Sequence, residues 1–294
     1  MSSFLKALQH GALLLDGALG TELERRGVDT SRPGWTSHAI VENPDTILQV
    51  HREYIHAGAR IVTANSFRTN PRAHKKTGLS AEELTKRSVE LAREAASGDP
   101  EIYVAGSIAP AIDSLPPQSV VLNDQELLQE HSLMAKWLAE ANVDVIFIET
   151  MNTVREAFIA LVAAKRNTSL PIAVSLVPAS GKHLLSGASL AESVDLLAKA
   201  GADVLLLNCQ SLSIVTPALR EFAALCAGAG IKWGVYPNAA ERVNSAWVLR
   251  AHEDHEFAAF AELARDNDAA IIGSCCGTTP STTEVMSTVL QSMR

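Results

Sequence analysis

The chain has 294 residues, a net charge of −8, and 47% hydrophobic against 20% charged residues. This composition is typical of a globular protein, and the acidic balance excludes the basic footprint of a protein that binds nucleic acid or anionic lipid. No apolar stretch approaches the roughly 20 residues that a membrane helix needs, and residues 1–20 lack an apolar segment long enough for export. We therefore expect a cytoplasmic protein that binds neither nucleic acid nor a membrane; the sequence carries no signal for the oligomeric state.

Eight short apolar runs follow one another along the whole chain. Each is apolar on both faces, which is typical of buried parallel strands. In chain order they span residues 12–18, 60–67, 102–108, 143–150, 171–178, 202–209, 231–238 and 269–276. Segments with helical apolar spacing lie between them, and the clearest span residues 44–59, 80–97, 123–141 and 188–202.

The boundaries of these helices carry the expected signals. An N-cap serine is followed three residues later by glutamate, and a glycine follows the last turn. The residues are Ser80 with Glu83, Ser189 with Glu192, Gly58 and Gly201. Eight strand-then-helix units without a linker predict an α/β fold, a single-domain (β/α)8 barrel over residues 1–294, rather than an open doubly wound sheet.

Active sites of such barrels lie at the C-terminal ends of the strands. The predicted strands end there in polar residues, so these side chains should share one rim. They are Asp16, Thr63, Asn65, Ser107, Glu149, Ser175, Asn208, Cys209, Tyr236, Asn238, Cys275 and Cys276. Three of the four cysteines therefore reach the rim, whereas Cys226 lies inside a helical pattern and is interpreted as core packing.

The adjacent pair Cys275 and Cys276 suggests a metal site shared with Cys209. Neighbouring strand residues point to opposite faces, so both sulfurs can reach one ion only if the backbone bends, which Gly273 and Gly277 would permit. Three thiolates with an open fourth position are typical of catalytic zinc. The alternative is that the three cysteines are buried without a metal.

A pair of histidines and a pair of carboxylates also bear on the hypothesis of a metal site. His252 and His255 form the nearest patterned histidine pair, and we expect them on a solvated helix face. No His-x-His ends the first strand, which argues against a metal-dependent hydrolase. Asp16 and Glu149 share the rim with the sulfurs and together favour a substrate with an amino group, although either carboxylate alone could be structural.

Six segments match one known family, in order and over essentially the whole chain. They are "DGALGTELERRG" (16–27), "TANSF" (63–67), "ETMNTVREA" (149–157), "LLNCQS" (206–211), "YPNA" (236–239) and "GSCCGT" (273–278). On these motifs the chain resembles the homocysteine S-methyltransferase family, whose members are zinc-bearing (β/α)8 barrels. The resemblance implies that Cys209, Cys275 and Cys276 are the catalytic zinc ligands. It also places Asp16 and Glu149 near the amino acid part of homocysteine.

The reaction that the resemblance implies is methyl transfer from a sulfonium donor, S-methylmethionine or S-adenosylmethionine, to the zinc-bound thiolate of homocysteine, giving methionine. Three protein thiolates give a zinc site a net charge of −1, which would attract a cationic donor. Asn208 and Asn238 are candidates for hydrogen bonds to the substrate sulfur or carboxylate. Their alternative role is loop structure.

The chain also departs from the usual pattern of the family. Ser274 stands where the family usually has glycine, and Asn152 lies where a proline often follows the Glu-Thr segment. Phe67 and Arg68 replace part of the Ser-Tyr-Gln sequence typical of the S-methylmethionine enzymes. The metal ligands survive these changes, but donor and acceptor stay open. The alternatives are methylation of a different thiol or selenol, or a non-catalytic zinc- or thiol-binding family member.

Overall fold

A computed structural model describes residues 2–112, 122–243, 246–249 and 254–292 of the chain. Eight strands form one parallel sheet: β1 (Leu13–Leu14), β2 (Ile61–Thr63), β3 (Tyr103–Ile108), β4 (Val145–Met151), β5 (Ile172–Leu176), β6 (Val204–Ser211), β7 (Lys232–Asn238) and β10 (Ile271–Ile272). The helices are α1 (Ser3–Ala7), α2 (Leu19–Arg25), α3 (Ala39–Glu42), α4 (Pro44–His56), α5 (Pro71–His74), α6 (Ala81–Ala96), α7 (Asp124–Glu140), α8 (Val154–Asn167), α9 (Leu190–Lys199), α10 (Leu212–Gly228), α11 (Asp254–Asp266) and α12 (Pro280–Gln291).

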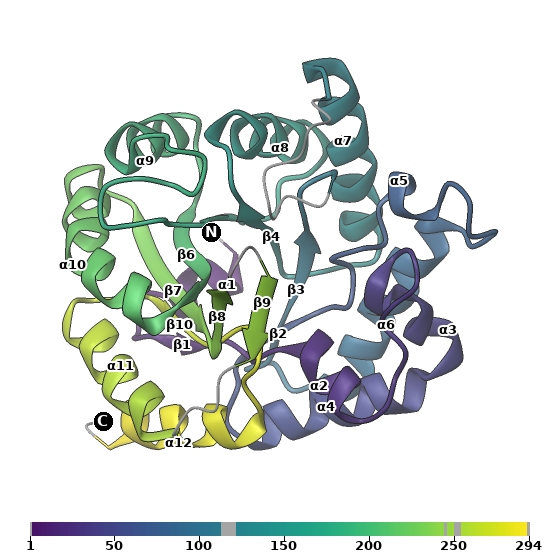
Figure 1. Ribbon diagram of the computed structural model, residues 1–294, viewed down its shortest axis with the longest axis horizontal. Coiled ribbons are helices and arrows are strands. Elements are labelled where there is room, and N and C mark those ends of the chain that lie inside the picture. Colours follow the sequence, from purple (N-terminus) through teal and green to yellow (C-terminus); the bar gives the residue numbers. More distant parts are fainter. Residues whose placement is uncertain (1, 113–121, 244–245, 250–253, 293–294) are drawn as a thin grey trace.

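The sheet closes on itself between its edge strands β1 and β2. Leu15 and Ile61 form a parallel bridge, the Asp16 amide donates to the Ile61 carbonyl at 2.9 Å, and the Arg60 amide donates to the Leu14 carbonyl at 2.7 Å. Helices surround the resulting ring of strands (Figure 1). The predicted (β/α)8 barrel is confirmed, and each predicted strand is present.

The four helices predicted most clearly are α4, α6, α7 and α9. The side chains of Ser80 and Ser189 accept hydrogen bonds from the amides of Glu83 and Glu192, as N-caps should. The glycines after α4 and α9 adopt the left-handed conformation that ends a helix, with φ of 104° and 88°. The cap signals therefore located these helix ends correctly.

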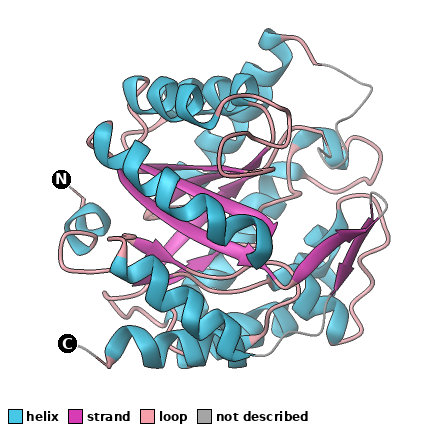
Figure 2. Ribbon diagram, turned by 60° about the vertical axis from the view of Figure 1, so that its left-hand side comes forward, coloured by secondary structure: helices cyan, strands magenta, loops and turns pink. Residues whose placement is uncertain are grey.

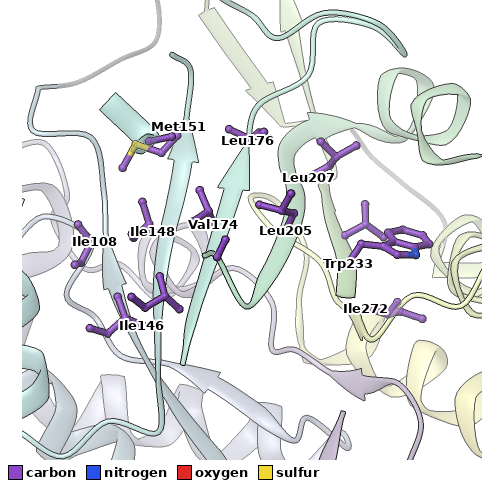
Figure 3. Close-up of a cluster of buried hydrophobic side chains, with 14 of the residues drawn as sticks. Ile108, Ile146, Ile148, Met151, Val174, Leu176, Leu205, Leu207, Trp233 and Ile272 are labelled. Carbon is purple, nitrogen blue, oxygen red and sulfur yellow. The ribbon is translucent and has the colours of Figure 1, made fainter. Parts of the chain in front are cut away.

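Both faces of the strands are buried, as the apolar runs predicted. In β4, Ile146 and Ile148 pack outward in the cluster between the sheet and the helices, while Val145 and Phe147 belong to a second cluster inside the barrel. Figure 3 shows the outward-facing set continuing across neighbouring strands. Alternation along each strand thus fills two apolar layers rather than one. Cys226 of α10 is fully buried in the outer layer, which confirms it as core packing.

The N-terminal segment closes the end of the barrel opposite the strand C-termini. Phe4 of α1 is fully buried, and its ring meets that of Tyr103, at the start of β3, edge to face with centroids 5.4 Å apart. Figure 2 shows α1 and the N-terminus beyond one end of the strands and a two-stranded hairpin beyond the other. The C-terminal helix α12 packs outside the barrel, against α11 and α4 (Figure 1).

The hairpin was not anticipated. It consists of β8 (Ala240–Val243) and β9 (Ala246–Leu249), which pair antiparallel directly after β7. His255, at the start of α11, is exposed as predicted, whereas His252 lies outside the described residues. Of the helices that the structure describes, none combines the length and the apolar composition that a membrane-spanning helix needs.

Candidate active site

A cavity of about 840 Å³ opens at the C-terminal ends of the strands. This volume suits a small-molecule ligand. The predicted rim residues that line it are Asp16, Thr63, Asn65, Glu149, Cys209, Tyr236, Asn238, Cys275 and Cys276. Ser107, Ser175 and Asn208 are fully buried and do not line the cavity. Most of the predicted rim therefore converges on one space.

The three predicted metal ligands lie together in the lining of this cavity. The Cys209 and Cys275 sulfurs are 3.3 Å apart, the Cys275 and Cys276 sulfurs are 3.9 Å apart, and all three lie within 4.8 Å of one another. Sulfurs bound at about 2.3 Å in a tetrahedral zinc site would lie roughly 3.8 Å apart. The cluster therefore has the spacing and the donor chemistry to hold one metal ion.

Backbone bends allow the sulfurs to converge. Cys209 has a φ of 52°, and the β6–β7 pairing shifts register between Asn208 and Ser211. After the adjacent cysteine pair, Gly277 has a φ of 84°, so the predicted bend is present there. Gly273 serves a different purpose: a Cβ atom at this position would lie 2.6 Å from the Cβ of Leu15. It permits close packing against β1 rather than a turn.

The loop that carries the adjacent cysteines is held by hydrogen bonds on both sides. The Cys275 amide donates to the Pro237 carbonyl at 2.8 Å, and the Ala239 amide donates to the Cys276 carbonyl at 2.8 Å. The Gly277 amide donates to the Thr21 hydroxyl at 2.9 Å. These contacts tie the loop to β7 and to α2, so the two sulfurs have a defined position.

The proximity of the three thiols affects the pKa of each one. Hydrogen bonds from Cys209 and then from Cys275 lower the pKa of Cys276 well below its usual value. Hydrogen bonds with Cys209 and Cys276, together with burial, raise the pKa of Cys275 well above it. A dication would replace the thiol protons, because metal ligands must be deprotonated.

Two buried carboxyl groups face the same cavity. Burial raises the pKa of Asp16 to about 8, although its oxygens accept hydrogen bonds from the amide (2.8 Å) and hydroxyl (3.1 Å) of Thr63. Burial raises the pKa of Glu149 to about 7, against hydrogen bonds from the Ser107 hydroxyl and from the Tyr236 hydroxyl (3.1 Å). Such shifted acids in a cleft are typical of functional sites.

The two candidate asparagines occupy different environments. Asn238 lines the cavity, and its Oδ1 has no hydrogen-bond partner among the described residues. Asn208 is fully buried and does not line the cavity: its Nδ2 donates to Thr150 Oγ1 at 3.0 Å. Thr150 in turn contacts the Cys209 sulfur. Asn238 is therefore placed to meet a ligand, whereas Asn208 supports the strand end behind Cys209.

An aromatic wall of the cavity was not predicted from the sequence. Trp35 and Phe67 both line the cavity, and their rings meet edge to face with centroids 5.9 Å apart. The Arg68 guanidinium lies over the Phe67 ring, 4.9 Å from its centroid. Residues 30–36, which supply Trp35, belong to no predicted strand and carried no motif that pointed to the cavity.

The comparison with known families agrees with the motifs. The family model described as "Homocysteine S-methyltransferase" matches residues 13–290. The chain belongs to the homocysteine S-methyltransferase family. The chain is 32% identical to the homocysteine S-methyltransferase of Escherichia coli strain K12, with 91% of this chain and 92% of that protein aligned.

Further relatives support the membership. The crystal structure of the homocysteine methyltransferase MmuM from Escherichia coli, in its metallated form, superposes with a TM-score of 0.85 at 28% identity, covering 97% of this chain and 99% of that one. The selenocysteine methyltransferase of Astragalus bisulcatus is 26% identical, with 96% and 93% of the two chains aligned. The resemblance stated from the six motifs is thereby confirmed.

The departure at Ser274 fits the structure. Its side chain is buried, and its hydroxyl lies 3.0 Å from Thr278 Oγ1. The Thr278 hydroxyl also donates to the Cys275 carbonyl at 2.7 Å. A serine in place of the usual family glycine therefore adds a hydrogen bond within the cysteine loop.

Proposed function

We propose that this protein is a zinc-dependent methyltransferase that moves a methyl group from S-methylmethionine or S-adenosylmethionine to homocysteine, giving methionine. The observation that carries the proposal is the cluster of three sulfurs opening onto the same cavity as two buried carboxyl groups. We further propose that the whole chain, residues 1–294, is one catalytic domain that acts in the cytoplasm, in methionine biosynthesis.

The donor set supports zinc as the metal. Cys209, Cys275 and Cys276 would hold it, because soft thiolates favour zinc and three protein ligands leave a fourth position for a substrate. When bound, zinc would keep the sulfur of homocysteine deprotonated at neutral pH, where a free thiol with a pKa near 8.5 is mostly neutral. The three thiolates around a dication leave a net negative charge, which favours a cationic sulfonium.

The carboxyl groups support an amino acid as acceptor. Asp16 and Glu149 are buried, so an ammonium group bound beside them would stabilise their charged forms. The Asn238 amide, with Oδ1 lacking a protein partner, would add a polar contact. The protein's remaining task is alignment of the acceptor sulfur, the methyl carbon and the leaving sulfur, which can supply a large share of the rate enhancement.

A different acceptor, a selenol, is a second candidate. The similarity to the selenocysteine methyltransferase of Astragalus bisulcatus favours it, because selenocysteine also carries an ammonium group for Asp16 and Glu149. A selenol is deprotonated more readily than a thiol, so it depends less on the metal for activation. Activity on a selenol that survives removal of zinc would distinguish this acceptor from homocysteine.

A thiol-by-donor panel tests the proposal. Zinc-loaded protein is incubated with homocysteine, cysteine, selenocysteine or a simple alkyl thiol, each with S-methylmethionine or S-adenosylmethionine. Mass spectrometry of the methylated product identifies the reacting pair. Methionine formation from homocysteine and a sulfonium supports the proposal. Bound donor that is never consumed, with any acceptor, would identify a non-catalytic binding protein instead.

A further inference from the structure

Two linked hydrogen-bond contacts lie beside Cys209, through Thr150, which also lines the cavity. The Asn208 side-chain Nδ2 donates to Thr150 Oγ1 at 3.0 Å, and this oxygen lies 3.5 Å from the Cys209 sulfur. Asn208 is fully buried and Thr150 is 5% exposed. Solvent therefore has little access to the contact, and each polar atom in it depends on the next.

The direction of the proton on Thr150 follows from simple counting. A hydroxyl has one proton and two lone pairs. The Asn208 amide occupies one lone pair of Thr150 by donating to it. A thiolate that ligates a metal has no proton to give, so the Thr150 proton must point to the Cys209 sulfur. The two hydrogen bonds then point in the same direction, from the Asn208 amide to the Thr150 hydroxyl and from that hydroxyl to the Cys209 sulfur.

The backbone conformation is built around this contact. Thr150 has a φ of 63° and Cys209 a φ of 52°, a region that β-branched residues in particular rarely adopt. Strand pairing shifts register at both places, between Ile148 and Met151 on one strand and between Asn208 and Ser211 on the other. Such outliers persist where the surrounding structure imposes them, commonly at functional sites.

We propose that Thr150 is a positioning residue for the metal: its hydroxyl donates to the Cys209 thiolate, and Asn208 orients that hydroxyl. The proposal rests on the proposed role of Cys209 as a zinc ligand. Outer partners of metal ligands orient them and tune the metal site. Here the donated hydrogen bond stabilises the thiolate form of Cys209 and keeps its sulfur directed at the other two.

Zinc affinity is the direct test, because a residue that only touched substrate would not change it. We compare wild type with Thr150→Val, which keeps the β-branched shape but lacks the hydroxyl, and with Thr150→Ser, which keeps the hydroxyl. Thr63→Val is the matched control, since Thr63 also ends a strand but donates to Asp16 instead of a sulfur. The probe is zinc alone, in competition with a chromophoric chelator.

We expect Thr150→Val to weaken zinc binding by about 10- to 100-fold, the usual loss for an outer partner of a metal ligand. Thr150→Ser and Thr63→Val should stay close to wild type. With cobalt in place of zinc, Thr150→Val should also shift the sulfur-to-cobalt charge-transfer band to lower energy, because the sulfur loses a donor. A Thr150→Val protein that binds zinc as tightly as wild type would overturn the proposal.

A second variant tests the direction of the two hydrogen bonds, and it also tests the proposal if Thr150→Val does not fold. Asn208→Asp places a carboxylate oxygen beside Thr150. This oxygen would accept a hydrogen bond from the Thr150 hydroxyl, so that a lone pair of the hydroxyl would face the sulfur. Zinc binding should weaken as much as in Thr150→Val, and unchanged affinity in this variant would refute the orienting role of Asn208. Absence of zinc binding in wild type would instead overturn the proposed function itself, so the two failures are distinguishable.

Discussion

Glu149→Gln separates substrate recognition from metal binding. Glutamine keeps the size of the side chain and can still accept a hydrogen bond from Ser107 or Tyr236, but it removes the negative charge from the cavity. Glu149 lies among the cavity-lining residues and is 8% exposed. A substrate ammonium beside it would therefore be desolvated and would depend on that charge.

The expected loss can be worked out from this burial. Removing one partner of a buried, hydrogen-bonded charge pair costs about 2–5 kcal/mol, and about 2 kcal/mol already corresponds to roughly 30-fold in affinity. Burial raises the pKa of Glu149 to about 7, so at pH 7 about half of the free protein carries the charge. This protonation reduces the difference by only about twofold, and a loss above tenfold is expected.

The assay compares two acceptors on the same zinc-loaded protein. Glu149→Gln should weaken homocysteine binding more than tenfold, leave zinc content unchanged, and hardly affect a simple alkyl thiol, which has no ammonium group. In wild type the ratio of homocysteine to alkyl-thiol affinity should also fall as the pH drops below about 7, because Glu149 becomes neutral. Equal losses for both thiols would refute this reasoning and assign Glu149 to the fold or the metal. No loss for either would leave Asp16 as the ammonium partner.

Three further results are expected. Cys209→Ala, Cys275→Ala and Cys276→Ala should each lose zinc by elemental analysis while Cys226→Ala retains it; full zinc in all three would contradict the metal site. Removal of zinc by a chelator should speed hydrogen exchange in residues 273–279 without unfolding the barrel, since eight βα units supply a core that one ion does not hold together; global unfolding would refute this. His51 is fully buried, its ring nitrogens have no partner in the described part of the chain, and burial lowers its pKa to about 4. Only the unfolded chain then takes up a proton at His51 between pH 6.5 and 4, so this residue alone should lower stability by about 2 kcal/mol from pH 7.5 to 5. The raised pKa values of Asp16 and Glu149 act in the opposite direction, but equally in wild type and His51→Leu. The stability difference between these two proteins in urea unfolding should therefore shift by about 2 kcal/mol in favour of His51→Leu over that range, and an unchanged difference would contradict this.

Much of the site was predictable because consecutive strands of the barrel lie side by side and all end at the same rim. Strands that are apolar on both faces can be recognised from sequence, and in a closed parallel barrel all their C-terminal ends meet. Asp16, Glu149 and Cys209 stand far apart in the sequence, yet each ends such a strand. Their convergence on one cavity follows from this rule without knowledge of any side-chain contact.

The orientation of Asn208 shows where that reasoning fell short. In β6, Val204 and Leu206 face the barrel interior and Leu205 and Leu207 face the helices. Alternation therefore places Asn208 on the inner face and would turn Cys209 outward. Both residues were predicted on the rim because both stand at the end of the apolar run 202–209. The φ of 52° at Cys209 breaks the alternation and turns its sulfur into the cavity, and the sequence carries no signal for that bend.

The conformations of Thr150 and Cys209 had no sequence signal of their own. A glycine in the sequence can indicate a positive φ, as Gly277 does here, whereas a threonine or a cysteine gives no such indication. Each such residue costs of order 1–3 kcal/mol, and surroundings that determine it must supply that energy. Here two neighbouring features, a buried asparagine donor and a sulfur that must turn toward two others, both require the bend. The strain, the Asn208–Thr150 bond and the sulfur cluster are therefore parts of one arrangement, and the filled barrel layers beneath it supply the stability that lets the strained strand ends persist.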